Sequence, residues 1–196
     1  HGKSTQFLSE HHVPKQLKII DFAQDFRLKA EGNDYIYGLP ELQREAIGKA
    51  VHVANPGCFA TCIQLGLLPL ASAGVLQGTV PVNAITGSTG AGVKPTDKTH
   101  FSWRTGNMSV YKAFRHQHVP EIIQSIKQLQ PSYDGSVEFL PYRGGFSRGI
   151  FATEVVRTNI SQGEIDKIYQ HFYKDAPFTF YSTRPIDMKQ VVNTNK

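Results

Sequence analysis

The sequence predicts an α/β or α+β protein, because strand-like and helix-like segments are mixed unevenly along it. The short apolar run at 17–22 is typical of a buried parallel strand. Ser161 and Glu164 have capping-box spacing and precede an amphipathic helix at 161–173. We therefore expect a doubly wound unit up to about residue 55, followed by a separate mixed sheet.

The remaining elements follow from periodicity and from residues that start or end helices. Pro40 and Pro120 each lie in the first turn of a predicted helix, and Gly74 closes another. A glycine-rich loop occupies 86–92, and an irregular stretch continues to about Ser109. Strands are predicted at 50–55, 80–86, 136–142 and 149–160, and helices at 40–47, 60–73 and 119–130.

Composition limits the classes of function. With 196 residues, of which 40% are hydrophobic and 19% charged, the chain can bury a core and is not typical of a disordered protein. Two cysteines are too few for a disulfide framework and fit a reducing cytoplasm. The longest apolar stretch, 59–76, is interrupted by polar residues and Pro69, so no membrane partner is expected.

The net charge of +5 comes from scattered basic residues rather than from a basic run. No nucleic-acid-binding motif accompanies this charge, so no nucleic-acid partner is expected. Small anionic substrates fit the charge as well as a nucleic acid would.

Cys58 is the first candidate for chemistry, because it lies directly before a predicted helix. Near a helix N-terminus, unpaired N–H groups and the macrodipole both favour thiolate, the nucleophilic form. Pro56 and Gly57 before it allow a tight backbone approach. Position alone leaves a second interpretation open, in which Cys58 is a small buried hydrophobe.

Cys62 is interpreted differently, because it lies four residues further along the same helix. There it shares the apolar side with Leu65 and Pro69, so we expect it to belong to the core. A disulfide between Cys58 and Cys62 is the minor alternative.

Two histidines supply candidate acid–base groups. His116 and His118 occupy alternate positions before a helix, and alternation in extended backbone predicts that they face opposite sides. At most one imidazole should therefore reach Cys58, where it could accept and donate a proton near neutral pH. Surface polarity or helix capping is the competing interpretation. The cysteine and histidine spacings match no known zinc motif, so no metal is expected.

The segments "NPGCFAT", "TGSTGAG" and "RHQHVPEI" follow one another along the chain, and together they resemble motifs of the N-acetyl-γ-glutamyl-phosphate reductases of arginine biosynthesis. The segment "NPGCFAT" is similar to the family's Asn-Pro-Gly-Cys-Tyr-Pro-Thr, and "TGSTGAG" to its Ser-Gly-X-Ser-Gly-Ala-Gly loop. The segment "RHQHVPEI" is similar to His-Arg-His-Thr-Pro-Glu-Ile. Further matches, in family order, are "IDFAQDFRL", "FSRGIFAT" and the first residues of the chain.

This sequence also departs from the family pattern. Phe59-Ala60 replaces Tyr-Pro after the cysteine, and Ala23-Gln24 replaces Ser-Ala. The resemblance covers about the middle two-thirds of the enzyme, without its N-terminal glycine-rich turn and its C-terminal helix. It therefore implies part of a Rossmann-type NADP-binding domain at 1–56. Residues 57–190 would then form a catalytic and dimerisation domain, like the C-terminal domain of glyceraldehyde-3-phosphate dehydrogenase. Residues 191–196 would begin the return of the chain to the nucleotide-binding domain.

The resemblance also implies a mechanism. Cys58 would form a thioester with N-acetyl-glutamyl 5-phosphate, NADP(H) would provide hydride, and His116 would act as acid and base. Ser88, Gly90 and Gly92 would approach the cofactor. The substrate would be held by Arg27, Arg148, Glu121 and His118. For each arginine, an ordinary ion pair is the alternative.

Three other interpretations of the function remain open at this stage. Aspartate-semialdehyde dehydrogenase shares the chemistry, and another acyl group could replace acetyl. The chain could instead be only a dimerisation module of a homo-oligomer, either a dimer or a tetramer.

Overall fold

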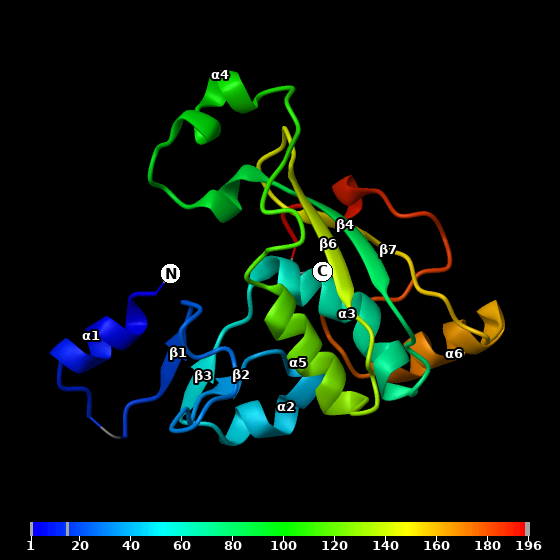
Figure 1. Ribbon diagram of the computed structural model, residues 1–196, viewed down its shortest axis with the longest axis horizontal. Helices are drawn as coiled ribbons and strands as arrows, with labels where there is room; N and C mark the ends of the chain where they lie inside the picture. The colour runs from blue at the N-terminus through cyan, green and yellow to red at the C-terminus, as the bar shows by residue number, and fades with distance from the viewer. Residues whose placement is uncertain (1, 15, 195–196) are drawn as a thin grey trace.

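The computed structural model describes residues 2–14 and 16–194 and contains two β-sheets with helices packed between and around them (Figure 1). The helices α3 (Cys58–Ser72) and α5 (Val119–Leu129) lie between the sheets. One sheet is parallel and the other is mixed. The α/β class and the two-part organisation of the sheets agree with the sequence prediction.

The first sheet contains three short parallel strands in the order β1-β3-β2. They are β1 (Ile19–Asp21), β2 (Ile36–Tyr37) and β3 (His52–Ala54). The helix α1 (Ser4–Glu10) precedes β1, and α2 (Pro40–Lys49) connects β2 to β3 with Pro40 in its first turn. This parallel arrangement was expected.

The predicted burial of the first strand is wrong. Ile20 is 65% exposed and the neighbouring Phe22 is 70% exposed, whereas Asp21 is buried. Alternation along a strand sends Ile20 and Asp21 to opposite faces. An apolar run indicates that a strand can be covered on both faces, but the packing around it decides whether each face is covered.

The second sheet has the order β5-β6-β4-β7. Its strands are β4 (Val80–Thr86), β5 (Ser109–Val110), β6 (Val137–Arg143) and β7 (Ile150–Glu154). β4 runs parallel to β6 and antiparallel to β7. β4 has the bounds predicted from sequence, but β7 ends at Glu154 rather than at 160. Its partner β4 has Pro81 near that end, and proline has no N–H to continue the ladder.

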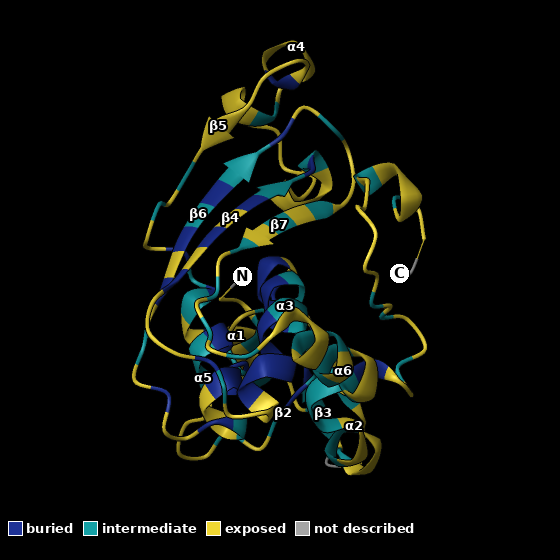
Figure 2. Cartoon of the chain, turned by 90° about the vertical axis from the view of Figure 1, so that its right-hand side faces the viewer, coloured by how far each residue is buried: buried dark blue, intermediate teal, exposed yellow. Residues whose placement is uncertain are grey.

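The main core lies where α3 and α5 pack on the inner face of β4 and β6. Figure 2 shows the buried segments gathered along α3. The largest fully buried side chains of this core include Phe59, Ile63, Leu67, Ile122, Ile126 and Phe139. Fully burying one such side chain stabilises the fold by about 1.5–3 kcal/mol. This core therefore holds the start of α3, where Cys58 lies, against α5 and β6.

The other helices lie at the edges of the fold. The predicted capping box is confirmed at α6 (Gln162–Tyr173), where the Ser161 amide donates to a Glu164 carboxylate oxygen at 2.8 Å. The irregular stretch before β5 contains the single turn α4 (Phe101–Arg104), which projects away from the sheet (Figure 1). Short 3₁₀ turns are η1 (Ser88–Ala91), η2 (Asp97–Thr99) and η3 (Met188–Gln190).

Two sequence predictions concern the chain as a whole. In the part of the chain that the structure describes, none of the helices has the length and apolar character needed to cross a bilayer. The predicted return at 191–196 lies partly in 195–196, outside the described residues.

Candidate active site

A pocket of about 360 Å³ opens at the N-terminus of α3 and contains Cys58. Segments from both halves of the sequence meet there: the end of β4, the glycine-rich loop and the segment before α5. The polar and ionisable side chains that line it are those of Arg27, Cys58, Thr86, Arg104, Tyr111, His116, Gln117, His118 and Arg143. This pocket brings together most of the residues that the sequence singled out.

Cys58 is the first residue of α3, two residues before the predicted helix start, and Gly57 is the N-cap. A Cβ atom on Gly57 would lie only 2.2 Å from Nε2 of His118, so a larger residue there would collide with the imidazole. The expected tight approach at Pro-Gly is therefore present. The absence of a side chain at Gly57 leaves room for the His118 imidazole beside the cysteine.

Glu121 holds this turn from α5. Its Oε2 accepts a hydrogen bond from the Gly57 amide at 3.0 Å and another from the Tyr37 hydroxyl at 2.9 Å. Its Oε1 pairs with Nη1 of Arg27 at 3.1 Å. Both carboxylate oxygens have protein donors and the residue is only 2% exposed, and its contact with substrate stays a prediction. Glu121 positions the turn that carries Cys58.

Arg27 reaches the pocket from the loop after β1. Its Nη1 pairs with Glu121 and its Nη2 donates to the Phe22 carbonyl at 2.9 Å. The side chain nevertheless lines the pocket, and its charge partly opposes the rise in the pKa of the Cys58 thiol that burial causes. Arg27 therefore joins the first sheet to the site, and the predicted ion-pair alternative is present.

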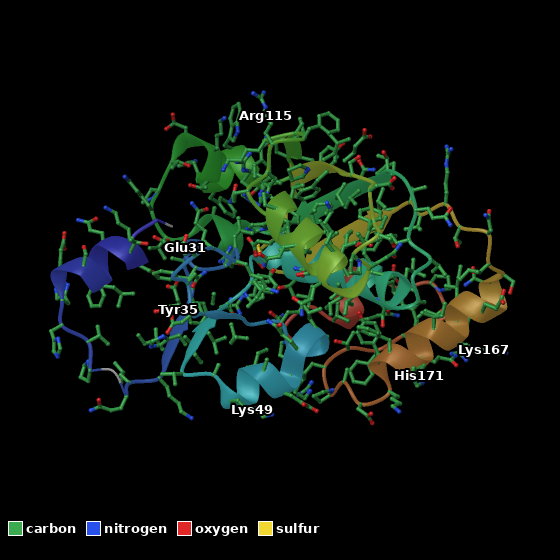
Figure 3. The ribbon with its side chains drawn as sticks, turned by 60° about the horizontal axis from the view of Figure 1, so that its bottom comes forward. Glu31, Tyr35, Lys49, Arg115, Lys167 and His171 are labelled. Atoms are coloured by element: carbon green, nitrogen blue, oxygen red, sulfur yellow. The ribbon has the colours of Figure 1, made fainter. Side chains whose placement is uncertain are left out.

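Both histidines line the same pocket, so the prediction that they face opposite sides is wrong. The segment is not extended: His118 has φ −84° and ψ −13°, and the two ring centroids lie 4.5 Å apart. Arg115, one residue before His116, instead points outward into solvent (Figure 3). The turn into α5 therefore collects both imidazoles at the pocket.

Burial keeps both imidazoles uncharged. It lowers the pKa of His116 to about 4, with Lys112 adding to the effect, and the pKa of His118 to about 3. The expected titration near neutral pH is therefore wrong. Phe59 contributes to this burial, because its ring packs edge-on against both imidazoles.

One hydrogen bond selects the tautomer of His116. Its Nδ1 lies 3.2 Å from the His118 amide, which can only donate, so Nδ1 is the acceptor. A neutral imidazole with an acceptor at Nδ1 carries its proton on Nε2. His116 is thus arranged as a hydrogen-bond donor through Nε2.

The Cys58 thiol shows two opposing effects. Although the residue touches solvent, it lies in a concave pocket, and burial raises the pKa of its thiol. The backbone amides of Phe59 and Cys58 and the charge of Arg27 act in the opposite direction. The helix N-terminus thus acts as the sequence indicated, but desolvation outweighs it, and the expected fall in pKa is wrong.

Cys62 is half-buried, and burial, followed by the nearby Glu154, raises the pKa of its thiol to about 12. This agrees with a packing role. Both cysteines are free thiols, so the alternative of a disulfide between them is not realised.

The glycine-rich loop borders two cavities. Gly90 lines the Cys58 pocket, while Ser88 and Gly92 line a neighbouring cavity of about 970 Å³. Arg148 is exposed to solvent and does not line the Cys58 pocket. Its backbone instead packs against Gly87, where a Cβ atom would lie 2.7 Å from the Arg148 amide nitrogen.

Sequence reasoning missed Arg104, Arg143 and Tyr111. Alternation could have found Arg143, since it follows Phe139 and Pro141 on the inner face of β6. For Arg104 the sequence contains no comparable signal. Among the described residues, no group of three or more potential metal ligands is close enough to hold an ion.

Comparison with known proteins places this chain in a family. The family described as "Semialdehyde dehydrogenase, dimerisation domain" matches residues 58–196. This chain belongs to that family. The match begins at Cys58, and it confirms the resemblance that the sequence motifs indicated.

Relatives of this chain include the N-acetyl-gamma-glutamyl-phosphate reductase of Bacteroides thetaiotaomicron, which is 60% identical over all 196 residues. The chain spans about 61% of the length of that protein. Among solved structures, aspartate semialdehyde dehydrogenase II from Vibrio cholerae has a TM-score of 0.56 at 18% identity, over 76% of this chain and 51% of that one. The Candida albicans enzyme, solved with NADP, has a TM-score of 0.53 at 11% identity, over 78% and 48%. These structures share the fold.

Proposed function

We propose that the protein containing this chain reduces N-acetyl-γ-glutamyl phosphate to the corresponding semialdehyde, releasing phosphate, as a step of arginine biosynthesis. The observation that carries the proposal is the pocket in which Cys58, at a helix N-terminus, meets two neutral imidazoles and three arginines. The 60% identity to the Bacteroides thetaiotaomicron reductase supports this choice of substrate.

The first half of the reaction uses Cys58 as nucleophile. Its thiol gives its proton to a neutral imidazole of the pocket, and the thiolate attacks the acyl carbon. The C–S bond forms as the C–O bond to phosphate breaks, and phosphate leaves with the bonding electrons. The product is a thioester on Cys58.

The second half uses His116 as a proton donor. When bound, NADPH would supply the hydride that reduces the thioester carbon. Nε2–H of His116 donates to the oxygen that becomes negatively charged, which gives a thiohemiacetal. His116 then takes a proton back as the C–S bond breaks and releases the aldehyde. General acid–base help of this kind contributes roughly a hundred- to ten-thousandfold in rate.

The loop at 86–92 fits the reacting end of the cofactor. The position where Gly92 would carry a Cβ has open space around it, and Gly92 has a φ of +77°, which favours glycine. Gly90 lines the Cys58 pocket, while Ser88 and Gly92 line the larger cavity beside it. We therefore place the nicotinamide end of NADP(H) along Ser88, Gly90 and Gly92.

The division of the chain follows the two sheets. We assign 1–56 to a nucleotide-binding domain and 57–190 to a catalytic and dimerisation domain, with a homo-oligomer formed through the latter. The family match from residue 58 supports this boundary. We also propose a cytoplasmic location, in keeping with the two free thiols.

The test is NADPH oxidation by the full-length protein with N-acetyl-γ-glutamyl phosphate. We expect Cys58→Ala to abolish turnover, whereas Cys62→Ser, a matched change on the same helix, keeps it. His116→Gln should lower kcat by roughly a hundredfold or more. Full activity in Cys58→Ala would overturn the proposed mechanism.

Two alternatives are tested in the same assay. Faster reduction of aspartyl phosphate than of the glutamyl substrate would favour an aspartate-semialdehyde dehydrogenase, whose fold this chain shares. If the protein transfers hydride to neither substrate but still forms a homo-oligomer, the result would favour a dimerisation module.

A further inference from the structure

Two arginines with no carboxylate partner among the described residues form a wall of the Cys58 pocket. Arg104 and Arg143 line this pocket and also an adjacent cavity of about 470 Å³, so they separate the two spaces. Neither forms an ion pair in the described part of the chain, although Asp97 lines the adjacent cavity. The pocket therefore contains two positive charges that the protein leaves unmatched.

Arg104 is the more buried of the two. It is the last residue of α4 and is only 8% exposed. One terminal nitrogen, Nη2, donates to the Thr86 carbonyl at 3.3 Å, and Nε is buried without a partner. A buried donor that lacks a partner destabilises the fold, because it has lost its hydrogen bonds to water. Such a cost is offset when a ligand supplies the missing acceptor.

Arg143 ends β6 and is held by an aromatic ring. Its guanidinium carbon lies 3.7 Å from the centroid of the Tyr111 ring. This cation–π contact fixes the side chain but leaves its N–H groups available. Arg143 also lies close enough to Arg104 to lower its pKa, an effect second only to burial. Like charges held together in this way are stabilised by an anion.

We propose that Arg104 and Arg143 bind the phosphoryl group of the substrate beside Cys58. A phosphoryl group carries up to two negative charges and three acceptor oxygens, which match two guanidinium groups better than a single carboxylate does. In the reaction proposed above, on which this inference rests, the pair neutralises the phosphate that leaves when the thioester forms. The substrate's carboxylate is the competing occupant.

The first experiment needs no hydride transfer. Full-length protein without cofactor is alkylated at Cys58 with iodoacetamide, an uncharged reagent, and the rate is followed by peptide mass at increasing inorganic phosphate. We expect phosphate to slow alkylation. In Arg104→Gln and Arg143→Gln, half-protection should require at least about tenfold more phosphate. Equal protection in both variants and wild type would overturn the proposal.

Arg148→Gln is the matched control, because Arg148 is exposed and lies outside the pocket. Its half-protection concentration should stay within about twofold of wild type. A loss of protection equal to that of the pocket variants would mean that general charge, rather than this pair, attracts phosphate.

The second experiment runs the reaction backwards, where phosphate and the semialdehyde are separate substrates. Arg143→Gln should raise the KM for phosphate by at least about tenfold and leave the KM for the semialdehyde within about twofold. The semialdehyde retains the carboxylate, so a rise confined to its KM would assign the pair to the carboxylate and overturn the proposal.

The two experiments separate this inference from the proposed function. Arginine-dependent protection of Cys58 without any reduction of the glutamyl substrate would support the phosphate site and contradict the reductase. Reduction of the glutamyl substrate, together with arginine variants whose phosphate KM and phosphate protection of Cys58 equal those of wild type, would support the reductase and contradict the phosphate site. Because Arg104 contacts Thr86, Arg104→Lys is included to keep the charge, and it should require less phosphate for half-protection than Arg104→Gln.

Discussion

Two sets of charged side chains border the Cys58 pocket, and they differ in whether their charges are paired among the described residues. In the Glu121 cluster, formed by Arg27, Tyr37, Gly57 and Glu121, the carboxylate has three protein donors. In the wall of Arg104 and Arg143, two cations lie near each other with no anion within ion-pair distance among the described residues. Nε of Arg27 lacks a partner, as Nε of Arg104 does, but the charge of Arg27 is matched.

The difference teaches how to separate positioning residues from binding residues. A buried ion pair contributes little net stability, because desolvation cancels most of the attraction, but removing one partner is costly. The Glu121 cluster therefore serves to hold the turn of Cys58 in place. Charges that the fold leaves unmatched at a pocket have a ligand as their natural partner.

Breaking the paired set should have the largest effect. Glu121→Gln leaves Arg27 buried without its anion, so we expect the free energy of unfolding to fall by about 3–5 kcal/mol. Chemical denaturation of variant and wild type measures this. Glu138→Gln, at an exposed carboxylate on β6, is the control and should change stability by less than about 0.5 kcal/mol. Equal effects of both substitutions on the free energy of unfolding would contradict the positioning role of the Glu121 cluster.

Glu154 sharpens the comparison, because this half-buried residue has a carboxyl group with no ion-pair partner among the described residues. Its carboxyl group packs on Gly66, where a Cβ atom would lie 2.2 Å from Oε2, and burial raises its pKa to about 8. In the unfolded chain the Glu154 carboxyl ionises near its ordinary pKa of 4.5, whereas in the folded chain it stays protonated until the pH approaches about 8. The stability that the protonated Glu154 carboxyl contributes is therefore fully present below pH 4.5 and is lost as the pH rises to about 8.

Glu154→Gln should abolish this slope. One pKa unit corresponds to about 1.4 kcal/mol, and residual solvent contact reduces the full shift. We expect the free energy of unfolding of the variant to exceed that of wild type by about 3 kcal/mol at pH 8 and to equal it at pH 4. Denaturation at both pH values measures this, and an unchanged difference between them would contradict the shift.

The smallest effect on stability should come from the unpaired set. Arg143→Gln removes a repulsion as well as the contact with Tyr111, so the free energy of unfolding should change by less than about 0.5 kcal/mol. Arg27→Gln, the same substitution in the Glu121 cluster, should lower it by about 3 kcal/mol or more. Thermal unfolding of the two variants provides the measurement. A large loss in Arg143→Gln would make it a structural residue.

Local sequence signals predicted the elements better than they predicted the site. The capping box at Ser161, the helix start at Pro40 and the bounds of β4 each depend on residues within one element. The partners of Glu121 lie 94, 84 and 64 residues away, and no short pattern encodes those distances. The prediction that His116 and His118 face opposite sides was wrong for a related reason. It assumed extended backbone, whereas the backbone of His118 is not extended.

By itself, the sequence determined the α/β class, the place of Cys58 at the start of a helix and the presence of His116 nearby, because these follow from periodicity, turn residues and motif order. Only the tertiary structure decided that both imidazoles are neutral, that the Cys58 pKa is raised and that Arg104 and Arg143 face the same pocket. The physical reason is that burial and charge pairing depend on which distant segments enclose a group. Those neighbours are brought together by the packing of α3 and α5 against the second sheet.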